Sequence, residues 1–215
     1  MDIERFKKLP IMGIARGVRA GEVEPLVDAV VSAGLETLEI TMNTQGAESL
    51  IAQTVKAAGN RLMVGAGTVL NLESLKSALD AGATFIVTPV MVDEVVEYCA
   101  KNVIPVFPGA LTPAEIYRAW NSGATMVKVF PAGFFGPEYF KEIKGPFADI
   151  ELLACGGVNA QNMTSYFNNG ADAVSFGGSI FRRDWLENKE FSRISGEVRK
   201  LTEAFKNRLN ENSQG

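Results

Sequence analysis

Short runs of apolar residues alternate with amphipathic segments along the whole chain. Eight of these runs have the length of a β-strand and are rich in Val, Ile, Leu and Phe, as expected for strands buried on both faces of a parallel sheet. The runs cover residues 11–16, 37–42, 62–68, 84–89, 104–110, 125–132, 151–157 and 173–178. The segments between them have helical spacing, and several end at glycine, a common signal for the end of a helix.

Eight strands that alternate with eight helices predict an α/β fold, namely a single-domain (β/α)8 TIM barrel with short loops. An open, doubly wound parallel sheet is the alternative. Its support is weak, because the Gly-x-Gly of residues 64–68 lacks the third glycine of a dinucleotide-binding motif. No linker divides the 215 residues. We therefore expect one domain over residues 1–215, with a frayed tail at 209–215.

Composition narrows the classes of protein. Hydrophobic residues make up 47% and charged residues 21%, the balance of a soluble globular domain. No apolar run approaches the ~20 residues of a membrane helix, and the first ten residues lack the apolar core of a signal peptide. The net charge is −4 and the basic residues are scattered. We expect a cytoplasmic protein that binds neither nucleic acid nor membrane.

The absence of histidine restricts the chemistry further. It excludes Ser–His and Cys–His nucleophile pairs and histidine general bases. A catalytic zinc site is disfavoured as well, because such sites nearly always use imidazole, and the two cysteines, Cys99 and Cys155, are too few for a thiolate cluster. We therefore expect no metal and no cofactor. The reactive groups should come from Lys, Glu, Asp, Tyr, Thr, Ser, Arg or backbone N–H groups.

Lys128 is the most informative of the polar residues near the strand ends. It lies in the middle of the apolar run MVKVF, where burial of an unpaired ammonium is costly and lowers the pKa of a lysine. A neutral amine attacks a ketone to form an imine, so Lys128 is a candidate nucleophile. The alternative is a structural Lys–Glu pair inside the barrel.

Glu39 is the carboxylate inside a strand in the first half of the chain. Strands two and six face each other across an eight-stranded barrel, so Glu39 and Lys128 are expected to point into one cavity. A carboxyl group beside an imine can transfer protons, with its pKa raised by apolar walls. The alternative is that Glu39 simply forms an ion pair with Lys128. The two roles are compatible.

Two pairs of glycines, Gly156–Gly157 and Gly177–Gly178, end the seventh and eighth strands. In barrels of this type, the loops after these strands often bind phosphate through backbone N–H groups. Tight turns without a ligand are the alternative, but two such turns on adjacent strands favour a phosphate site.

Eight motifs, taken in order and spacing, resemble the 2-keto-3-deoxy-6-phosphogluconate (KDPG) aldolases. The resemblance extends from about Ile11 to about Phe181, and its most specific parts are VGAGTVLN and the VKVFPA…KGPF block. The motifs are LEITMNT, VGAGTVLN, IVTP, FPGALTPAE, VKVFPA, IKGPF, CGGVN and FGGS.

The resemblance implies a class I lyase that splits KDPG into pyruvate and glyceraldehyde 3-phosphate, with 4-hydroxy-2-oxoglutarate (KHG) as a second substrate and a homotrimeric assembly. Lys128 matches the Schiff-base lysine and Glu39 the general acid/base. The other matched positions are Thr68, Pro89 and Phe130 around the pyruvyl group, and Gly156, Gly157, Gly178 and Ser179 at the phosphate.

Some positions depart from the gluconate pattern. Asn43 stands where many KDPG aldolases carry an arginine that binds the substrate carboxylate, and Arg16 is expected to supply this charge instead. Asn43 and Arg16–Gly17 are more similar to the 6-phosphogalactonate aldolases, whereas Gly178–Ser179 resembles the gluconate type. Cys155 replaces the threonine usual in gluconate enzymes.

Three alternatives to a KDPG aldolase therefore stay open. One is a 2-keto-3-deoxy-6-phosphogalactonate (KDPGal) aldolase. The second is a sugar-phosphate epimerase or isomerase, which the lack of histidine disfavours. The third is a barrel that binds phosphosugars without catalysis, although both the lysine and the glutamate are present.

Overall fold

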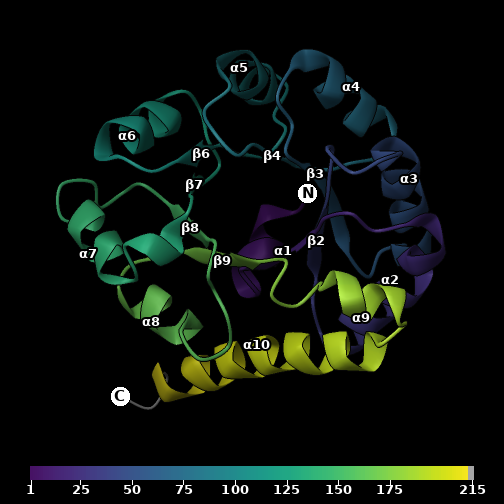
Figure 1. Cartoon of the computed structure of the whole chain (residues 1–215). Helices are drawn as coiled ribbons and strands as arrows, with labels where there is room; N and C mark the ends of the chain where they lie inside the picture. Colours follow the sequence, from purple (N-terminus) through teal and green to yellow (C-terminus); the bar gives the residue numbers. More distant parts are fainter. Residues whose placement is uncertain (213–215) are drawn as a thin grey trace.

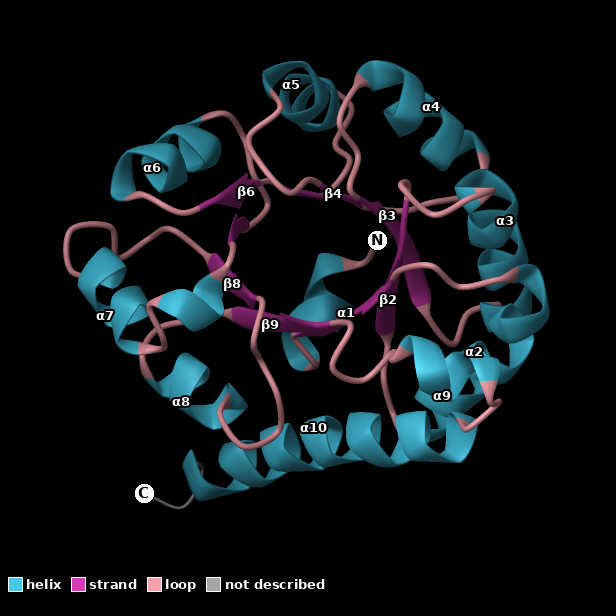
Figure 2. Ribbon diagram, viewed as in Figure 1, coloured by secondary structure: helices cyan, strands magenta, loops and turns pink. Residues whose placement is uncertain are grey.

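A ring of parallel strands surrounds the centre of the molecule, and helices surround the ring (Figures 1 and 2). The computed structural model describes residues 1–212. The strand order is β5-β4-β3-β2-β1-β9-β8-β7-β6, and all eight strand pairs are parallel. The strands are β1 (Ile11–Ala15), β2 (Thr37–Thr41), β3 (Met63–Gly67), β4 (Ile86–Val87), β5 (Val106–Phe107), β6 (Gly109–Ala110), β7 (Val127–Val129), β8 (Leu152–Cys155) and β9 (Ala173–Phe176). The predicted (β/α)8 barrel is confirmed.

The fifth barrel strand is divided into β5 and β6 by Pro108, whose nitrogen carries no hydrogen for the strand ladder. The carbonyl of Pro108 still accepts a hydrogen bond from the Lys128 backbone at 2.9 Å, so the ring continues through this residue. At Gly109 the backbone of strand four comes very close. A Cβ atom at this position would lie 2.1 Å from the Pro89 carbonyl oxygen, so only glycine fits.

Ten α-helices occur in the described residues, together with the 3₁₀ turns η1 (Ala20–Glu22) and η2 (Ala132–Phe134). The helices are α1 (Ile3–Lys8), α2 (Val23–Ser32), α3 (Ala47–Ala58), α4 (Leu72–Asp80), α5 (Asp93–Lys101), α6 (Pro113–Asn121), α7 (Glu138–Lys144), α8 (Met163–Asn168), α9 (Arg183–Glu187) and α10 (Phe191–Asn212). Helices α2–α8 and α10 are the eight predicted ones that alternate with the strands. Helices α1 and α9 are additions that the alternating pattern did not indicate. No helix within residues 1–212 combines the length and apolar character needed to cross a bilayer.

In Figure 2, helix α1 lies within the outline of the strand ring. Its ion pairs place it at the end of the barrel where the strands begin. Its Arg5 pairs with Glu36 at 2.5 Å, just before β2, and its Lys7 pairs with Glu151 at 2.6 Å, just before β8. Phe6 is fully buried and meets Phe107 edge-on, with ring centroids 5.8 Å apart. Helix α1 therefore fills the amino end of the barrel, and the carboxyl end is left for a site.

Helix α10 continues as far as Asn212 and so enters the range 209–215, for which a frayed tail is predicted. Its last turns are held by tertiary contacts. Arg208 donates to Asn168 at 3.2 Å and lies over the ring of Phe167. Residues 213–215 lie outside the described residues.

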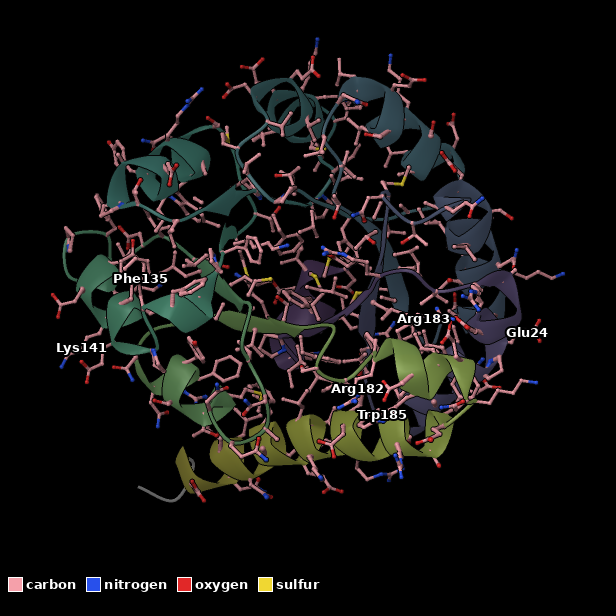
Figure 3. All side chains as sticks on the ribbon, viewed as in Figure 1. Glu24, Phe135, Lys141, Arg182, Arg183 and Trp185 are labelled. Atoms are coloured by element: carbon pink, nitrogen blue, oxygen red, sulfur yellow. The ribbon has the colours of Figure 1, made fainter. Side chains whose placement is uncertain are left out.

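The buried side chains form two clusters. The larger cluster lies between the strands and the surrounding helices. The smaller one lies inside the ring and is rich in sulfur and aromatic rings, with Met12, Met63, Phe85, Phe107 and Met126 among its members; Figure 3 shows sulfur atoms gathered there. Buried polar side chains on β2, β7 and β9, including Glu39, Lys128 and Ser175, are set within this apolar interior. The barrel interior thus combines a packed apolar part with a polar part next to the cavity described below.

Candidate active site

A cavity of about 620 Å³ opens at the carboxyl ends of the strands. Such a position is where the active sites of barrel enzymes lie. Nine of the eleven residues that the sequence singled out line it, and they come from six different strands or the loops after them. They are Arg16, Thr68, Pro89, Lys128, Phe130, Gly156, Gly157, Gly178 and Ser179.

Lys128 occupies the middle of β7, with Gly109 and Leu153 opposite it on the neighbouring strands. Its side chain is only 7% exposed, and its Nζ lies 5.5 Å from the centroid of the Phe130 ring. Within residues 1–212, no ion pair of 4.0 Å or less joins Lys128 to a carboxylate. The structural Lys–Glu pair is therefore not formed, and the amine faces a cavity in which a ketone has room.

Glu39 lies in β2, behind the lining of the cavity, with 1% of its surface exposed. Its Oε2 has no hydrogen-bond partner in the described residues. Burial raises the pKa of the Glu39 carboxyl, and the positive charges of Lys128 and Arg16 act in the opposite direction. A buried carboxyl with a raised pKa is suited to accept and return a proton.

The closeness of Glu39 to strand β3 depends on a glycine. A Cβ atom at Gly67 would lie 2.2 Å from Glu39 Oε1, well inside contact distance. The motif VGAGT, interpreted first as a weak dinucleotide signal, therefore supplies the space for the carboxyl group. Thr68, the residue after Gly67, lines the cavity, and its backbone φ is positive at 56°.

Arg16 directly follows β1 and is an exposed cation on the cavity wall. Within the described residues no ion pair engages its guanidinium. Asn43, in contrast, is exposed and lies outside the cavity lining. Of the two positions considered for binding a carboxylate, only Arg16 therefore faces the cavity.

The two glycine turns lie side by side at the cavity wall. Gly156 and Gly157 adopt φ values of +94° and +82°, which residues with a side chain rarely adopt. Gly178 has no atom within 4 Å of the place where a Cβ would stand, so its backbone is open. Ser179 follows with a hydroxyl. This arrangement leaves backbone groups and a hydroxyl accessible to an anion.

Cys155 and Ser175 stand on neighbouring strands, directly opposite each other, and both line the cavity. Burial raises the pKa of the Cys155 thiol, while the charge of Lys128 and a hydrogen bond with Ser175 act against this rise. The thiol is therefore a small buried group beside the lysine rather than a nucleophile.

Sequence analysis missed Ser175 and Arg183 as cavity residues. Ser175 had a signal, because it is a hydroxyl inside the apolar run AVSF. Arg183 had none, since it stands in the charged stretch RRD that resembles an exposed surface. Figure 3 shows Arg183 at α9, beside the ring of strands. Among residues 1–212, no group of three or more His, Cys, Asp or Glu side chains is placed to hold a metal ion.

Comparisons with known proteins agree with this geometry. The family model "KDPG and KHG aldolase" matches residues 3–196. The 2-dehydro-3-deoxy-6-phosphogalactonate aldolase of Escherichia coli K12 is 35% identical over 81% of this chain and 86% of its own. The 2-dehydro-3-deoxy-phosphogluconate aldolase of Pseudomonas aeruginosa is 33% identical over 86% of each chain.

Solved structures are similar as well. A native KDPGal structure superposes with a TM-score of 0.88 at 31% identity, covering 94% of this chain and 97% of that one. The KDPG aldolase from Legionella pneumophila, with pyruvate captured as a covalent carbinolamine, gives 0.83 at 25% identity, covering 89% and 93%. With a buried lysine in the cavity wall, a buried carboxyl near it and a family model that matches most of its length, the chain belongs to the KDPG and KHG aldolase family and is a class I, Schiff-base aldolase.

Proposed function

We propose that this enzyme cleaves 2-keto-3-deoxy-6-phosphogluconate to pyruvate and glyceraldehyde 3-phosphate, with Lys128 as the Schiff-base residue. The observation that carries the proposal is the buried Lys128 side chain in the cavity wall, with Arg16 and the glycine turns lining the same cavity. A keto acid needs a cation for its carboxylate, an amine for its ketone and N–H donors for its phosphate. The lining offers all three.

In the proposed mechanism, the neutral amine of Lys128 attacks the C2 ketone, and loss of water gives a protonated imine. Glu39, through a water molecule, removes the proton of the C4 hydroxyl. The C3–C4 bond then breaks, its electrons pass into the imine to form an enamine, and the aldehyde leaves. Glu39 returns a proton to C3, and hydrolysis of the imine frees pyruvate and Lys128.

The remaining candidate residues receive binding roles. Arg16 binds the carboxylate of the keto acid, and Thr68, Pro89 and Phe130 enclose the pyruvyl group. Gly156, Gly157, Gly178 and Ser179 bind the phosphate through backbone N–H groups and the Ser179 hydroxyl. Asn43 lies outside the cavity lining and receives no binding role. In this proposal Arg16 replaces the carboxylate-binding arginine that many KDPG aldolases carry at the position of Asn43.

A second candidate substrate is the C4 epimer, 2-keto-3-deoxy-6-phosphogalactonate. Two observations favour this substrate. Arg16 lines the cavity whereas Asn43 does not, and one of the relatives is named as a galactonate aldolase. The unphosphorylated 4-hydroxy-2-oxoglutarate is a third. Assays of the two epimeric phosphates and the unphosphorylated acid side by side, compared by kcat/KM, decide among them.

The test of the Schiff base is covalent capture. The protein is incubated with pyruvate, sodium borohydride is added, and the intact protein and its peptides are weighed by mass spectrometry. We expect a reduced pyruvyl adduct on Lys128 and none in Lys128→Ala. Absence of an adduct at saturating pyruvate would favour a barrel that binds phosphosugars without this chemistry.

We further propose that the enzyme is a cytoplasmic homotrimer that binds neither nucleic acid nor membrane. Support for an assembly comes from aromatic side chains on one surface, since Phe134 is 85% exposed and Phe135 is 57% exposed. Light scattering after gel filtration should give three times the 23.2 kDa of one chain. A mass of 23.2 kDa would exclude the trimer.

A further inference from the structure

The backbone of Gly17, the residue directly after Arg16, is held from two sides. Its N–H donates to Thr44 Oγ1 at 3.0 Å, and its carbonyl oxygen accepts from the guanidinium of Arg183 at 2.7 Å. The Thr44 hydroxyl also bonds to the buried Thr41 hydroxyl at 3.0 Å. Gly17 itself has a φ of +69°. One side chain from the loop after β2 and one from the first residue of α9 thus satisfy both polar backbone groups of this turn.

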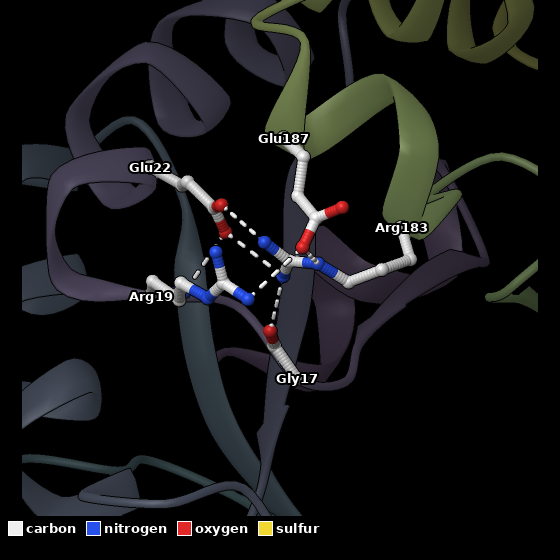
Figure 4. Close-up of polar contacts among 5 residues, drawn as sticks. All are labelled: Gly17, Arg19, Glu22, Arg183 and Glu187. Carbon is white, nitrogen blue, oxygen red and sulfur yellow. Dashed lines mark hydrogen bonds and ion pairs between the residues drawn. The ribbon is translucent and has the colours of Figure 1, made fainter.

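Arg183 is in turn fixed by two carboxylates, as Figure 4 shows. Glu22 accepts from both terminal nitrogens of Arg183, at 2.6 and 3.3 Å, and Glu187 lies 3.0 Å from Nε. Glu22 is only 8% exposed and also accepts from the Arg19 backbone N–H at 2.9 Å. A two-pronged arginine–carboxylate pair of this kind fixes direction as well as distance.

The two arginines of the cavity wall therefore differ. The Arg183 guanidinium donates to the Gly17 carbonyl and to both oxygens of Glu22, and its Nε lies 3.0 Å from Glu187, so its charge is already engaged by protein oxygens. Arg16 stands on the same wall without an ion pair in the described part of the chain. One arginine is free to bind an anion, and the other holds the turn from which the first projects.

We propose that Arg183 and Thr44 are positioning residues that hold the Arg16 turn so that its charge meets the carboxylate of the keto acid. The proposal rests on the carboxylate role given to Arg16 above. A long flexible side chain binds more tightly when its backbone is fixed in advance, because less freedom is lost on binding. Arg183 and Thr44 should therefore set the preference for a charged keto acid over a neutral ketone.

The competing explanation is purely structural. Arg183 follows β9 and Gly17 follows β1, and these strands pair where the first and last strands of the barrel meet. A bond that only ties the ends of the barrel together would change stability and would affect every substrate alike. A positioning role would affect only substrates that carry a carboxylate.

The experiment compares pyruvate with pyruvamide, its neutral analogue, by the concentration dependence of borohydride trapping on Lys128. In Arg183→Gln and in Thr44→Val, the pyruvate concentration for half-maximal trapping should rise about tenfold, within the ~100-fold that a displacement of 1 Å can cause. The values for pyruvamide and the maximal trapping rates should stay unchanged. Thr44→Ser, which keeps the hydroxyl, should restore the wild-type value.

Two further variants complete the design. Arg182→Gln is the matched control, because this neighbouring arginine pairs with Asp184 and has no bond to Gly17. It should leave the preference for pyruvate intact. Arg16→Ala should lose the preference, and adding Arg183→Gln to it should cause no further loss, since residues that act through one another are not additive.

The outcomes separate the two levels of the argument. If Arg16→Ala keeps the preference for pyruvate, the carboxylate role of Arg16 fails, while the imine on Lys128 is still detected. If Arg16→Ala loses the preference but Arg183→Gln and Thr44→Val keep it, the positioning role is overturned and the proposed function stands. Equal losses for pyruvate and pyruvamide would also overturn it, in favour of a structural tie. Because Thr44→Val leaves no charge unpaired, it tests the proposal even where Arg183→Gln fails to fold.

Discussion

At the scale of single residues, Glu39 carries an energetic conflict. Its carboxyl is buried, and one oxygen has no hydrogen-bond partner among the described residues. An isolated ionised carboxylate in such surroundings is costly, so burial raises its pKa, and the charges of Lys128 and Arg16 only partly offset this. The protein tolerates a destabilising group at this position, to which the proposed mechanism assigns proton transfer.

The stability of the protein should therefore depend on pH through Glu39. The Glu39 pKa is raised above its ordinary 4.5 in the folded state. Protonated Glu39 therefore contributes to the free energy of unfolding in full below pH 4.5, and this stabilisation is lost as pH rises through the folded-state pKa. Glu39→Gln should therefore match the wild type in acid and become the more stable of the two as pH rises to 8. In a domain of this size, 1 kcal/mol corresponds to about 2–4 °C in Tm.

Thermal unfolding of both proteins from pH 4 to pH 8 measures this difference. Cleavage by Glu39→Gln should fall about 10²- to 10⁴-fold at the same time, the usual contribution of a general acid or base. A difference in Tm that stays constant across the pH range would contradict the assignment.

Gly67 should be as sensitive to substitution as the proposed catalytic residues, although it has no reactive atom. In Gly67→Ala the added Cβ would overlap Glu39 Oε1, so the carboxyl must move away from its position. We expect kcat to fall about 100-fold, as for a displacement of about 1 Å. The matched control is Gly21→Ala, where nothing lies within 4 Å of the new atom. Similar kcat values for the two variants would show that Glu39 does not need its present position.

Most residues of the candidate site could be predicted from local sequence patterns. Lys128 and Glu39 are charged residues inside apolar strands, and the glycine pairs end strands, so each has a local signal. The bond between Arg183 and Gly17 joins residues that are 166 positions apart. The sequence around either residue gives no indication of this hydrogen bond, because the bond forms only when the barrel closes.

At the scale of elements, helix α6 has a defined start. The Thr112 hydroxyl accepts from the Glu115 backbone N–H at 3.3 Å, and the Glu115 carboxylate accepts from the Thr112 backbone N–H at 2.8 Å. The Leu111 backbone N–H donates to the same carboxylate. These backbone donors lower the pKa of Glu115, so the stabilisation is present at neutral pH and declines as pH falls below 4.5.

Removal of this capping box should destabilise the protein moderately. Thr112→Ala is expected to lower the free energy of unfolding by about 1 kcal/mol at pH 7, because one helix-terminal N–H loses its partner. Thr112→Ser, which keeps the hydroxyl, should stay near the wild type. Urea denaturation measures both, and an unchanged midpoint for Thr112→Ala would show that the cap contributes nothing.

The elements themselves could be predicted where a periodic pattern exists. All eight apolar runs contain a barrel strand, since buried parallel strands are apolar on both faces. The division of the fifth strand was not predicted, because it depends on Pro108 and on how closely Gly109 meets strand four. Helix α1 was missed for a related reason. It has one fully buried side chain, Phe6, and is held by contacts with distant residues.

At the scale of the whole molecule, the barrel separates stability from chemistry. Phe6 packs at the amino end with Phe107, which also meets Phe85 edge-on, whereas the cavity lies at the carboxyl end. The apolar interior between them forms the floor of the site. Changes at the closed end should therefore alter the stability of the protein with little effect on substrate binding.

Phe6→Ala tests this separation. The loss of a fully buried aromatic ring should cost about 3–5 kcal/mol of unfolding free energy. The KM of the folded protein for its substrate should stay within about twofold of the wild type, because the reacting groups keep their geometry. Lys8→Ala, an exposed position on the same helix, is the control and should change neither quantity. A large rise in KM for Phe6→Ala would show that the two ends of the barrel are coupled.

The pairing of β1 with β9 has a consequence for biosynthesis. A nascent chain that has left the ribosome as far as β7 already carries Lys128 and Glu39, but it lacks β9 and Arg183. Contacts between distant parts of a chain form late, since a large loop must close first. Lys128, the proposed nucleophile, is thus made early in translation, while the turn that carries Arg16 gains its bond to Arg183 only near the end. A prematurely terminated chain would retain Lys128 but not the contact from Arg183 that holds the Arg16 turn.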